Sequence, residues 1–305
     1  MKIIVTGGAG FIGLHTVEKL IERGHTPVIF DHYDRRADYP CEVILGDMRD
    51  EVAVTEAFGH ADGFIHLAGV LGTQETISNP RPAAQSNLMG GLNVLAAASQ
   101  YNLPGVYIGV GNHWMNNTYS ISKTMIERFI SMYNKEHGTK INIVRAMNAY
   151  GPRQRPVAPW GSSKVRKITP SFICRALEDL PIEVYGDGQQ ISDMVWVGDV
   201  AHALVVALEK AAEGEVFPEP VEVGPAVNTT VQEVAELIIE LTESESEIVN
   251  LPMRPGEVPN AVVSADVSTL KYVDMKAESL YDIQQGMTDT INYFKTYLLE
   301  RNPPA

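Results

Sequence analysis

Short apolar runs alternate, along the first half of the chain, with longer segments in which apolar residues recur every three or four positions. The short runs predict strands at residues 2–5, 27–30, 42–45, 63–66, 106–108 and 141–144. The longer segments predict helices near residues 11–23, 51–58, 80–101 and 119–137. Strands and helices in this order are typical of an α/β fold with a Rossmann-type, doubly wound parallel sheet that carries helices on both faces.

The alternation ends near residue 150, where Pro- and Gly-rich segments with shorter elements begin. We therefore expect a smaller C-terminal substrate-binding domain over the carboxyl edge of the sheet, where such folds bind ligands. Residues 1–150 plus about 192–225 are assigned to the larger domain. Residues 151–191 plus 226–305 are assigned to the smaller one.

Composition narrows the class of protein. The 305 residues carry a formal net charge of −14, which argues against binding nucleic acid or an anionic membrane. No apolar run approaches the length of a membrane span and the chain opens on a strand, so we expect a cytoplasmic protein without a signal peptide. Cys41 and Cys174 are far apart and are predicted to be reduced thiols, and no metal site is predicted.

The most informative local feature is a glycine-rich turn between the first strand and the first helix. Gly7, Gly10 and Gly13 have the spacing of a dinucleotide fingerprint. Glycines in such a turn let the backbone approach a pyrophosphate, whose charge then lies at the helix N-terminus. This context predicts a dinucleotide cofactor.

Two carboxylates follow the next strands. Asp31 ends the second strand, where a carboxylate accepts the adenosine ribose hydroxyls and repels a 2′-phosphate, so NAD is favoured over NADP. Arg35 and Arg36 could soften that preference, although a solvated loop describes them better. Asp47 could accept from the adenine amino group, or it could belong to a turn and helix cap.

Tyr119 and Lys123 form a candidate catalytic pair. On a helix they are four residues apart and point the same way. An adjacent ammonium favours a phenolate and is expected to bring the pKa of the tyrosine toward the working pH, while the lysine also holds a cofactor ribose. The alternative is an ordinary exposed pair on a helix surface.

An ordered set of short motifs accompanies the fingerprint and the Tyr119/Lys123 pair. These motifs are GDMRD at 46–50, IHLA at 65–68, NLMGGLNVL at 87–95, RAMNAYGPR at 145–153, VYGDG at 184–188 and RPGE at 254–257. Together they make the chain resemble the extended short-chain dehydrogenase/reductase family, the NAD-dependent nucleotide-sugar epimerases and dehydratases. The pattern is most similar to that of UDP-sugar 4-epimerases, apart from the active-site loop.

The resemblance implies roles for individual positions. NAD would bind in the larger domain, at Gly7, Gly10, Phe11, Ile12, Gly13, Asp31, Asp47, Met48, Leu67, Ala68, Gly69, Asn87, Tyr119 and Lys123. A nucleotide-sugar, with a UDP-sugar favoured, would contact Asn148, Arg153, Tyr185 and Arg254. Asn148 could instead be a turn residue, and Tyr185 could be core. A homodimer is implied, paired through the helix near 80–101 and the helix of Tyr119, although the apolar positions Leu88, Leu92, Leu95, Ile126, Phe129 and Ile130 would serve a core equally well.

The first departure from the family pattern follows the fifth strand. Gly111, Asn112 and His113 stand where relatives carry a Ser or Thr and, in dehydratases, an Asp-Glu pair. Thr118, Asn112 or His113 could replace the missing donor, and His113 could act as acid or base near neutral pH. The other interpretation is that His113 is merely packed.

The second departure is Ser192, which stands where relatives place an arginine that contacts the diphosphate. The segment after Pro152 is the most basic in the chain, with Arg153, Arg155, Lys164, Arg166 and Lys167. Its cations could close over the phosphates, or they could belong to a solvated loop.

The sequence therefore predicts an NAD-dependent nucleotide-sugar epimerase that inverts C4 of a hexose through a transient 4-keto intermediate. A dehydratase or reductase with a repositioned acid is one alternative. A catalytically weak nucleotide-sugar-binding protein is another.

Overall fold

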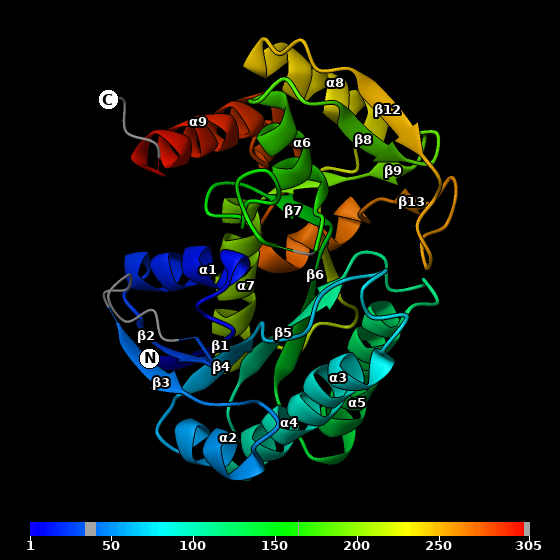
Figure 1. Ribbon diagram of the computed structural model, residues 1–305. Helices are drawn as coiled ribbons and strands as arrows, with labels where there is room; N and C mark the ends of the chain where they lie inside the picture. The colour runs from blue at the N-terminus through cyan, green and yellow to red at the C-terminus, as the bar shows by residue number, and fades with distance from the viewer. Residues whose placement is uncertain (34–40, 164, 302–305) are drawn as a thin grey trace.

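The computed structural model describes residues 1–33, 41–163 and 165–301, and it consists of two lobes (Figure 1). The larger lobe is built on a seven-stranded sheet in the order β11-β6-β5-β4-β1-β2-β3, and every pair in it is parallel. The strands of this sheet are β1 (Lys2–Thr6), β2 (Thr26–Asp31), β3 (Glu42–Leu45), β4 (Gly63–His66), β5 (Gly105–Val110), β6 (Ile141–Ala146) and β11 (Val221–Val223). The predicted doubly wound parallel sheet is confirmed.

Helices cover both faces of this sheet. On one face α1 (Phe11–Glu22) packs against α7 (Val197–Ala212), and on the other lie α2 (Glu51–Phe58), α4 (Gly90–Tyr101) and α5 (Thr118–Glu136) (Figure 1). Each face buries its own apolar cluster. Strands buried on both sides explain why the sequence shows continuous apolar runs.

The helix predicted near residues 80–101 is present, but it is not α-helical throughout. It comprises α3 (Pro80–Ala84), a single π-helical turn (Gln85–Met89) and α4. Single π-turns inside α-helices occur frequently at functional sites.

The smaller lobe contains α6 (Ile168–Ala176), α8 (Val231–Thr242) and α9 (Ile283–Arg301) around a third apolar cluster. Its strands β8 (Ile182–Tyr185) and β12 (Ile248–Leu251) pair in parallel. The expectation of shorter elements after residue 150 holds for the strands, which have two to four residues each, and is wrong for the helices, because α7 has 16 residues and α9 has 19.

Short elements connect the lobes. β7 (Asn148–Tyr150) pairs with β10 (Met194–Trp196), and β9 (Ile191–Ser192) pairs with β13 (Val262–Val263). Two 3₁₀ helices, Val267–Val273 and Ala277–Ser279, follow. The domain boundaries given above stay a prediction.

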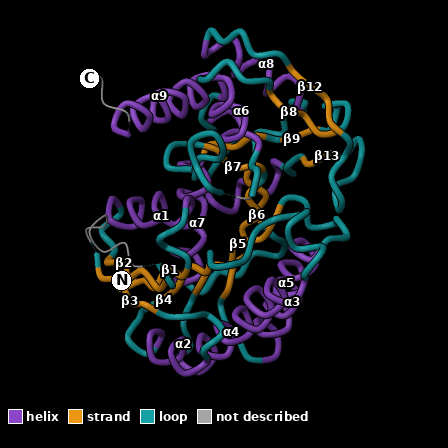
Figure 2. Tube along the Cα trace, viewed as in Figure 1, coloured by secondary structure: helices purple, strands orange, loops and turns teal. Residues whose placement is uncertain are grey.

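Loops from the two lobes meet at the edge of the molecule (Figure 2). The loop after β4 and the segment before β13 are in contact there, since a Cβ atom on Gly256 would collide with Ile77. None of the helices in the described ranges is both long enough and apolar enough to cross a membrane.

Candidate active site

The glycine-rich turn forms a bare backbone surface at the carboxyl end of β1. Gly7 has a φ of +70°, and a Cβ atom there would lie 2.7 Å from the backbone nitrogen of Ala68. A Cβ atom on Gly13 would collide with the Gly7 carbonyl oxygen. Side chains are therefore excluded where a pyrophosphate would approach the N-terminus of α1, which Phe11 and Ile12 open.

Asp31 is held rigidly at the end of β2. It is 7% exposed, and its carboxylate accepts hydrogen bonds from the backbone N–H groups of Ala9 at 3.1 Å and Tyr33 at 3.2 Å. The contact with Ala9 places this carboxylate beside the glycine-rich turn, as expected of a ribose acceptor. Arg35 and Arg36 lie outside the described residues.

Asp47 lies on the neighbouring turn after β3. Hydrogen bonds from the Arg49 guanidinium lower the pKa of Asp47 to about 2. Met48, next to it, is buried, and its carbonyl accepts from the Asn93 side chain at 2.9 Å. Asp47 therefore remains a charged acceptor, and its contact with adenine stays a prediction.

The end of β4 lies against the glycine-rich turn. Thr6 Oγ1 and His66 Nδ1 share a hydrogen bond of 2.6 Å, and Thr6 Oγ1 also accepts from the Ala68 N–H at 3.4 Å. Burial, followed by the charge of Lys123, lowers the pKa of His66 to about 3, so this histidine is neutral. The backbone of Leu67 and Ala68 thus continues the surface that begins at Gly7.

Asn87, on the π-turn, fixes the next stretch of loop. Its Oδ1 accepts from the Val70 N–H at 2.7 Å, and its Nδ2 donates to the Val70 carbonyl and to Ser122 Oγ. A Cβ atom on Gly69 would lie 3.0 Å from Asn87 Oδ1. Asn87 therefore ties the loop after β4 to the helix of Tyr119, and direct contact with the cofactor stays a prediction.

Tyr119 and Lys123 lie one turn apart on α5. Lys123 is 3% exposed, and its Nζ lies 4.2 Å from the centroid of the Tyr107 ring. Burial lowers the pKa of Lys123 to about 7, and the carboxylate of Glu127 opposes that shift. A pKa near neutral makes this lysine sensitive to small changes in its surroundings.

The lowering of the Tyr119 pKa expected from Lys123 is not found in this structure. Desolvation raises the pKa of Tyr119 above the usual phenol range. The physical reason is that the ammonium packs over Tyr107, and within the described residues no hydrogen bond joins it to Tyr119.

The loop after β5 carries the first sequence departure. A Cβ atom on Gly111 would lie 2.6 Å from Met147 Sδ and 3.2 Å from Val263 Cγ1, so apolar side chains fill the space around this position. The Thr118 hydroxyl donates a hydrogen bond to the Thr76 carbonyl, at 3.0 Å.

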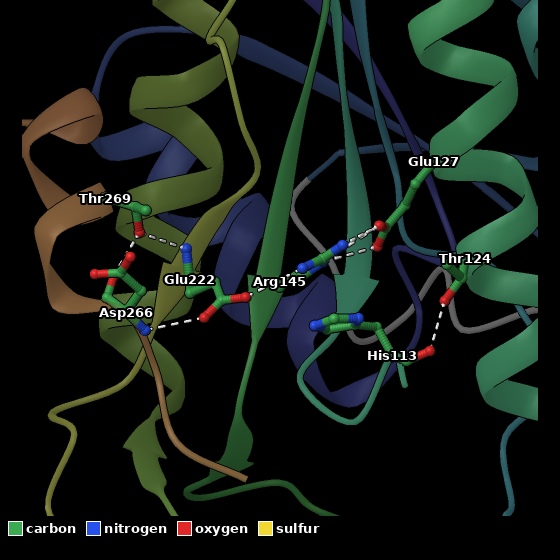
Figure 3. Close-up of polar contacts among 7 residues, drawn as sticks. All are labelled: His113, Thr124, Glu127, Arg145, Glu222, Asp266 and Thr269. Carbon is green, nitrogen blue, oxygen red and sulfur yellow. Dashed lines mark hydrogen bonds and ion pairs between the residues drawn. The ribbon is translucent and has the colours of Figure 1, made fainter. Parts of the chain in front are cut away.

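His113 lies beside Arg145, between that strand residue and α5 (Figure 3). Its backbone carbonyl accepts from Thr124 Oγ1 at 3.2 Å. Burial, followed by the charge of Arg145, lowers the pKa of His113. His113 is thus hydrogen-bonded to Thr124 and lies within reach of the charges of Arg145, Glu127 and Glu222, and its acid or base role stays a prediction.

Part of the predicted substrate set comes together in the smaller lobe. Arg254 lies over the Tyr185 ring, 4.6 Å from its centroid, and pairs with Glu257. Arg166 donates to Tyr185 Oη at 3.1 Å, and the Lys167 ammonium interacts with the charges of Arg254 and Glu257. Three cations therefore gather beside Tyr185, and the carboxylates of Glu75, Glu183 and Glu257 balance their charges.

The other residues considered for the substrate have described partners within the protein. Arg153 pairs with Glu18 on α1 at 2.6 Å, and Arg155 lies over Tyr33. The backbone N–H of Asn148 donates to the Asp193 carbonyl at 3.0 Å. Of the basic segment after Pro152, only Arg166 and Lys167 have described contacts with Arg254, and Lys164 is outside the described residues.

Comparison with known proteins decides the family. The model of the NAD dependent epimerase/dehydratase family matches residues 3–224, most of the chain. This protein belongs to that family. It is 28% identical, over 96% of this chain and 98% of the relative, to the UDP-N-acetyl-alpha-D-glucosaminuronate decarboxylase of Bacillus cytotoxicus. It is 29% identical, over 96% and 98%, to a putative UDP-glucose 4-epimerase of Methanocaldococcus jannaschii.

Among solved structures, the UDP-glucose 4-epimerase of Thermus thermophilus in complex with NAD is similar throughout. It has a TM-score of 0.83 and 27% identity, and the match covers 97% of this chain and 99% of that one. NAD is the cofactor of this epimerase/dehydratase family member, and the bare turn at Gly7 and Gly13 with the rigid Asp31 carboxylate fits it.

Two residues of the site were not predicted from the sequence. Glu127 on α5 and Arg145 on β6 form a buried ion pair one turn beyond Lys123. The available signal was charge within buried segments: Glu127 is next to the buried Ile126, and Arg145 lies in β6, which is paired on both sides.

Proposed function

We propose that this epimerase/dehydratase family member inverts C4 of a UDP-hexose. The observation that carries the proposal is the pairing of Tyr119 and the buried Lys123 on α5 with a loop, residues 111–113, that holds no carboxylate. Epimerisation through a 4-ketone needs one acid/base group, whereas loss of water needs a further pair. The UDP-sugar names of the relatives support the nucleotide.

Tyr119 is the proton-transferring group in this proposal. Its Oη accepts the proton of the 4-hydroxyl as C4 is oxidised and donates it back as the ketone is reduced. NAD supplies the hydride acceptor for the oxidation and the hydride for the return. Tyr119 acts without the usual Ser or Thr. Met147 and Val263 surround Gly111, and the Thr118 hydroxyl already donates its hydrogen bond to the Thr76 carbonyl.

Lys123 has two tasks. Its N–H donors suit the cofactor ribose hydroxyls, and its positive charge stabilises the Tyr119 phenolate when that forms. Because desolvation raises the pKa of Tyr119, the phenolate forms only with such help.

Arg254 and Tyr185 are assigned to the nucleotide diphosphate and base. A guanidinium suits a diphosphate because it donates two parallel hydrogen bonds. Glu257 accepts hydrogen bonds from the Arg254 guanidinium in this structure, so a diphosphate would have to replace or adjust that ion pair. Lys167, which interacts with the charges of Arg254 and Glu257, is assigned as the cation that compensates for the arginine missing at Ser192.

We also propose that the protein is a homodimer in the cytoplasm. Met89, Ile121, Met125 and Met132, on the π-turn and α5, are exposed apolar side chains that a partner would cover. Of the positions considered from sequence, Leu95, Ile126 and Ile130 belong to the core instead. Light scattering should give twice the mass of the chain.

The test is incubation with NAD and a panel of UDP-, dTDP- and GDP-sugars, followed by mass spectrometry and proton NMR. A UDP-sugar product of unchanged mass with altered couplings at C4 is expected. Loss of water or of carbon dioxide would replace the epimerase assignment with dehydration or decarboxylation. No change with any sugar would favour a binding protein.

A further inference from the structure

A buried ion network lies directly beyond Lys123 on α5. Glu127 is 6% exposed and accepts hydrogen bonds from Arg145 on β6, the shortest being 2.6 Å between Nη2 and Oε2. Arg145 Nη1 also donates to Glu222 Oε1 on β11 at 3.1 Å (Figure 3). One guanidinium thus holds two carboxylates, one of them on the catalytic helix.

The sheet is shaped to admit this pair. A Cβ atom on Gly109 of β5 would collide with Glu127 Oε1 and would lie 2.8 Å from Arg145 Cγ. At the outer end, Glu222 Oε2 accepts from the Asp266 N–H at 2.9 Å, and the Glu222 N–H donates to Thr269 Oγ1 at 2.9 Å. The network is therefore fixed at both ends, and the Glu127 carboxylate has little freedom to turn away from Arg145.

The surroundings of Lys123 contain one opposing charge. From β4 it faces His66, which is neutral, and from β5 it faces Tyr107, whose pKa is raised by burial so that the phenol stays protonated. Tyr119 on its own helix is also a neutral phenol. Among the described groups, Glu127 is the one whose charge counteracts the effect of burial on Lys123.

His113 completes the set of groups around the network. It lies beside Arg145 (Figure 3), and with a lowered pKa it is neutral at neutral pH. Arg145 is paired on both sides, with Glu127 and Glu222. No described residue other than Glu127 thus offers a negative charge to Lys123.

We propose that Glu127, held by Arg145, is a positioning residue that keeps the Lys123 ammonium charged and in place for the cofactor. Glu127 is one helical turn from Lys123 and both side chains are buried, so their opposite charges are weakly screened. A buried ion pair by itself contributes little net stability, so structural support alone is a weak reason for this one. The inference rests on the proposed function only in assigning Lys123 to NAD.

The test is the pH dependence of the NAD dissociation constant, measured by calorimetry across neutral and mildly alkaline pH. Wild-type affinity should fall as pH rises and Lys123 loses its proton. In Glu127→Gln this fall should move to lower pH by about one unit, the size expected for removal of a nearby opposite charge. Glu127→Asp, which keeps the charge, should restore most of the wild-type midpoint.

Glu222→Gln is the matched control, because it removes a carboxylate from the same network without removing the one beside Lys123. It should lower the melting temperature and leave the midpoint of the NAD titration unchanged. If Glu127→Gln fails to fold, the double variant Glu127→Leu/Arg145→Met removes the pair without leaving a buried unpaired charge. In this double variant, too, the midpoint of the NAD titration should move to lower pH.

If Glu127→Gln and Glu127→Leu/Arg145→Met both kept the wild-type midpoint of the NAD titration, the proposal would be overturned. The network would then have a structural role alone. NAD affinity independent of pH in the wild type would overturn it as well. Because NAD binding requires no sugar, failure of the sugar panel together with a shifted midpoint would reject the epimerase assignment and retain the role of Glu127.

Discussion

Replacing Tyr119 by Phe is expected to lower the turnover of the UDP-sugar by about 10²–10⁴-fold, the usual contribution of a positioned acid/base group. The reason is that Tyr119 is the group assigned to the 4-hydroxyl proton, and the neighbouring loop offers no carboxylate in its place. NAD affinity should change little, since the glycine-rich turn and Asp31 are untouched. Steady-state kinetics and calorimetry measure the two quantities.

Tyr133→Phe is the matched control for this variant. It makes the same change on the same helix, at a tyrosine that stacks on His137 outside the site. Its turnover should equal that of the wild type. Wild-type turnover in Tyr119→Phe would show that another group moves the proton, and His113 would then be the next residue to replace.

Replacing Lys123 by Met is expected to make the protein inactive and more stable. Burial of the lysine lowers its pKa from 10.5 to about 7, so the folded state holds its proton more weakly than the unfolded state does. Met keeps much of the apolar stem and removes the buried charge. The free energy of unfolding at neutral pH should rise by about 1–2 kcal/mol, as when other functional but destabilising residues are replaced.

The extra stability of Lys123→Met depends on pH because the pKa of Lys123 is lower in the folded state than in the unfolded state. Between about pH 7 and 10.5 the unfolded wild type binds a proton that the folded wild type does not, so its stability rises with pH in that range. The advantage of Lys123→Met should therefore be largest below pH 7 and shrink as pH rises. Denaturant unfolding at several pH values measures it, and a variant less stable than the wild type below pH 7 would contradict the account.

The sequence was sufficient for the sheet because strands buried on both faces must be apolar throughout. Six of the seven sheet strands were predicted from apolar runs, and Gly63–His66, which is fully buried, has its observed bounds. The edge strand Glu42–Leu45 was predicted with its observed bounds as well, although it is only partly buried. The seventh, β11, has only three residues, too few for a periodic signal. The π-turn at Asn87 was missed because its apolar spacing resembles that of an ordinary helix.

The site was less predictable because burial, which a sequence shows only indirectly, decides its electrostatics. The spacing of Tyr119 and Lys123 predicts a shared helix face, but not that desolvation raises the pKa of the tyrosine while the lysine packs on Tyr107. Arg153 was assigned to the substrate from its motif, yet it pairs with Glu18 across the lobes. Glu127 and Arg145 are 18 residues apart and meet only through the strand order.

The most direct test of the central claim is to follow deuterium from C4 of UDP-[4-²H]hexose through one turnover of the NAD-loaded protein. The account predicts a C4 epimer that keeps the deuterium on C4, because the atom removed in the oxidation returns to the same carbon from the opposite face. A product that has lost the label from C4, or one that has lost water or carbon dioxide, would contradict C4 epimerisation by a transient ketone.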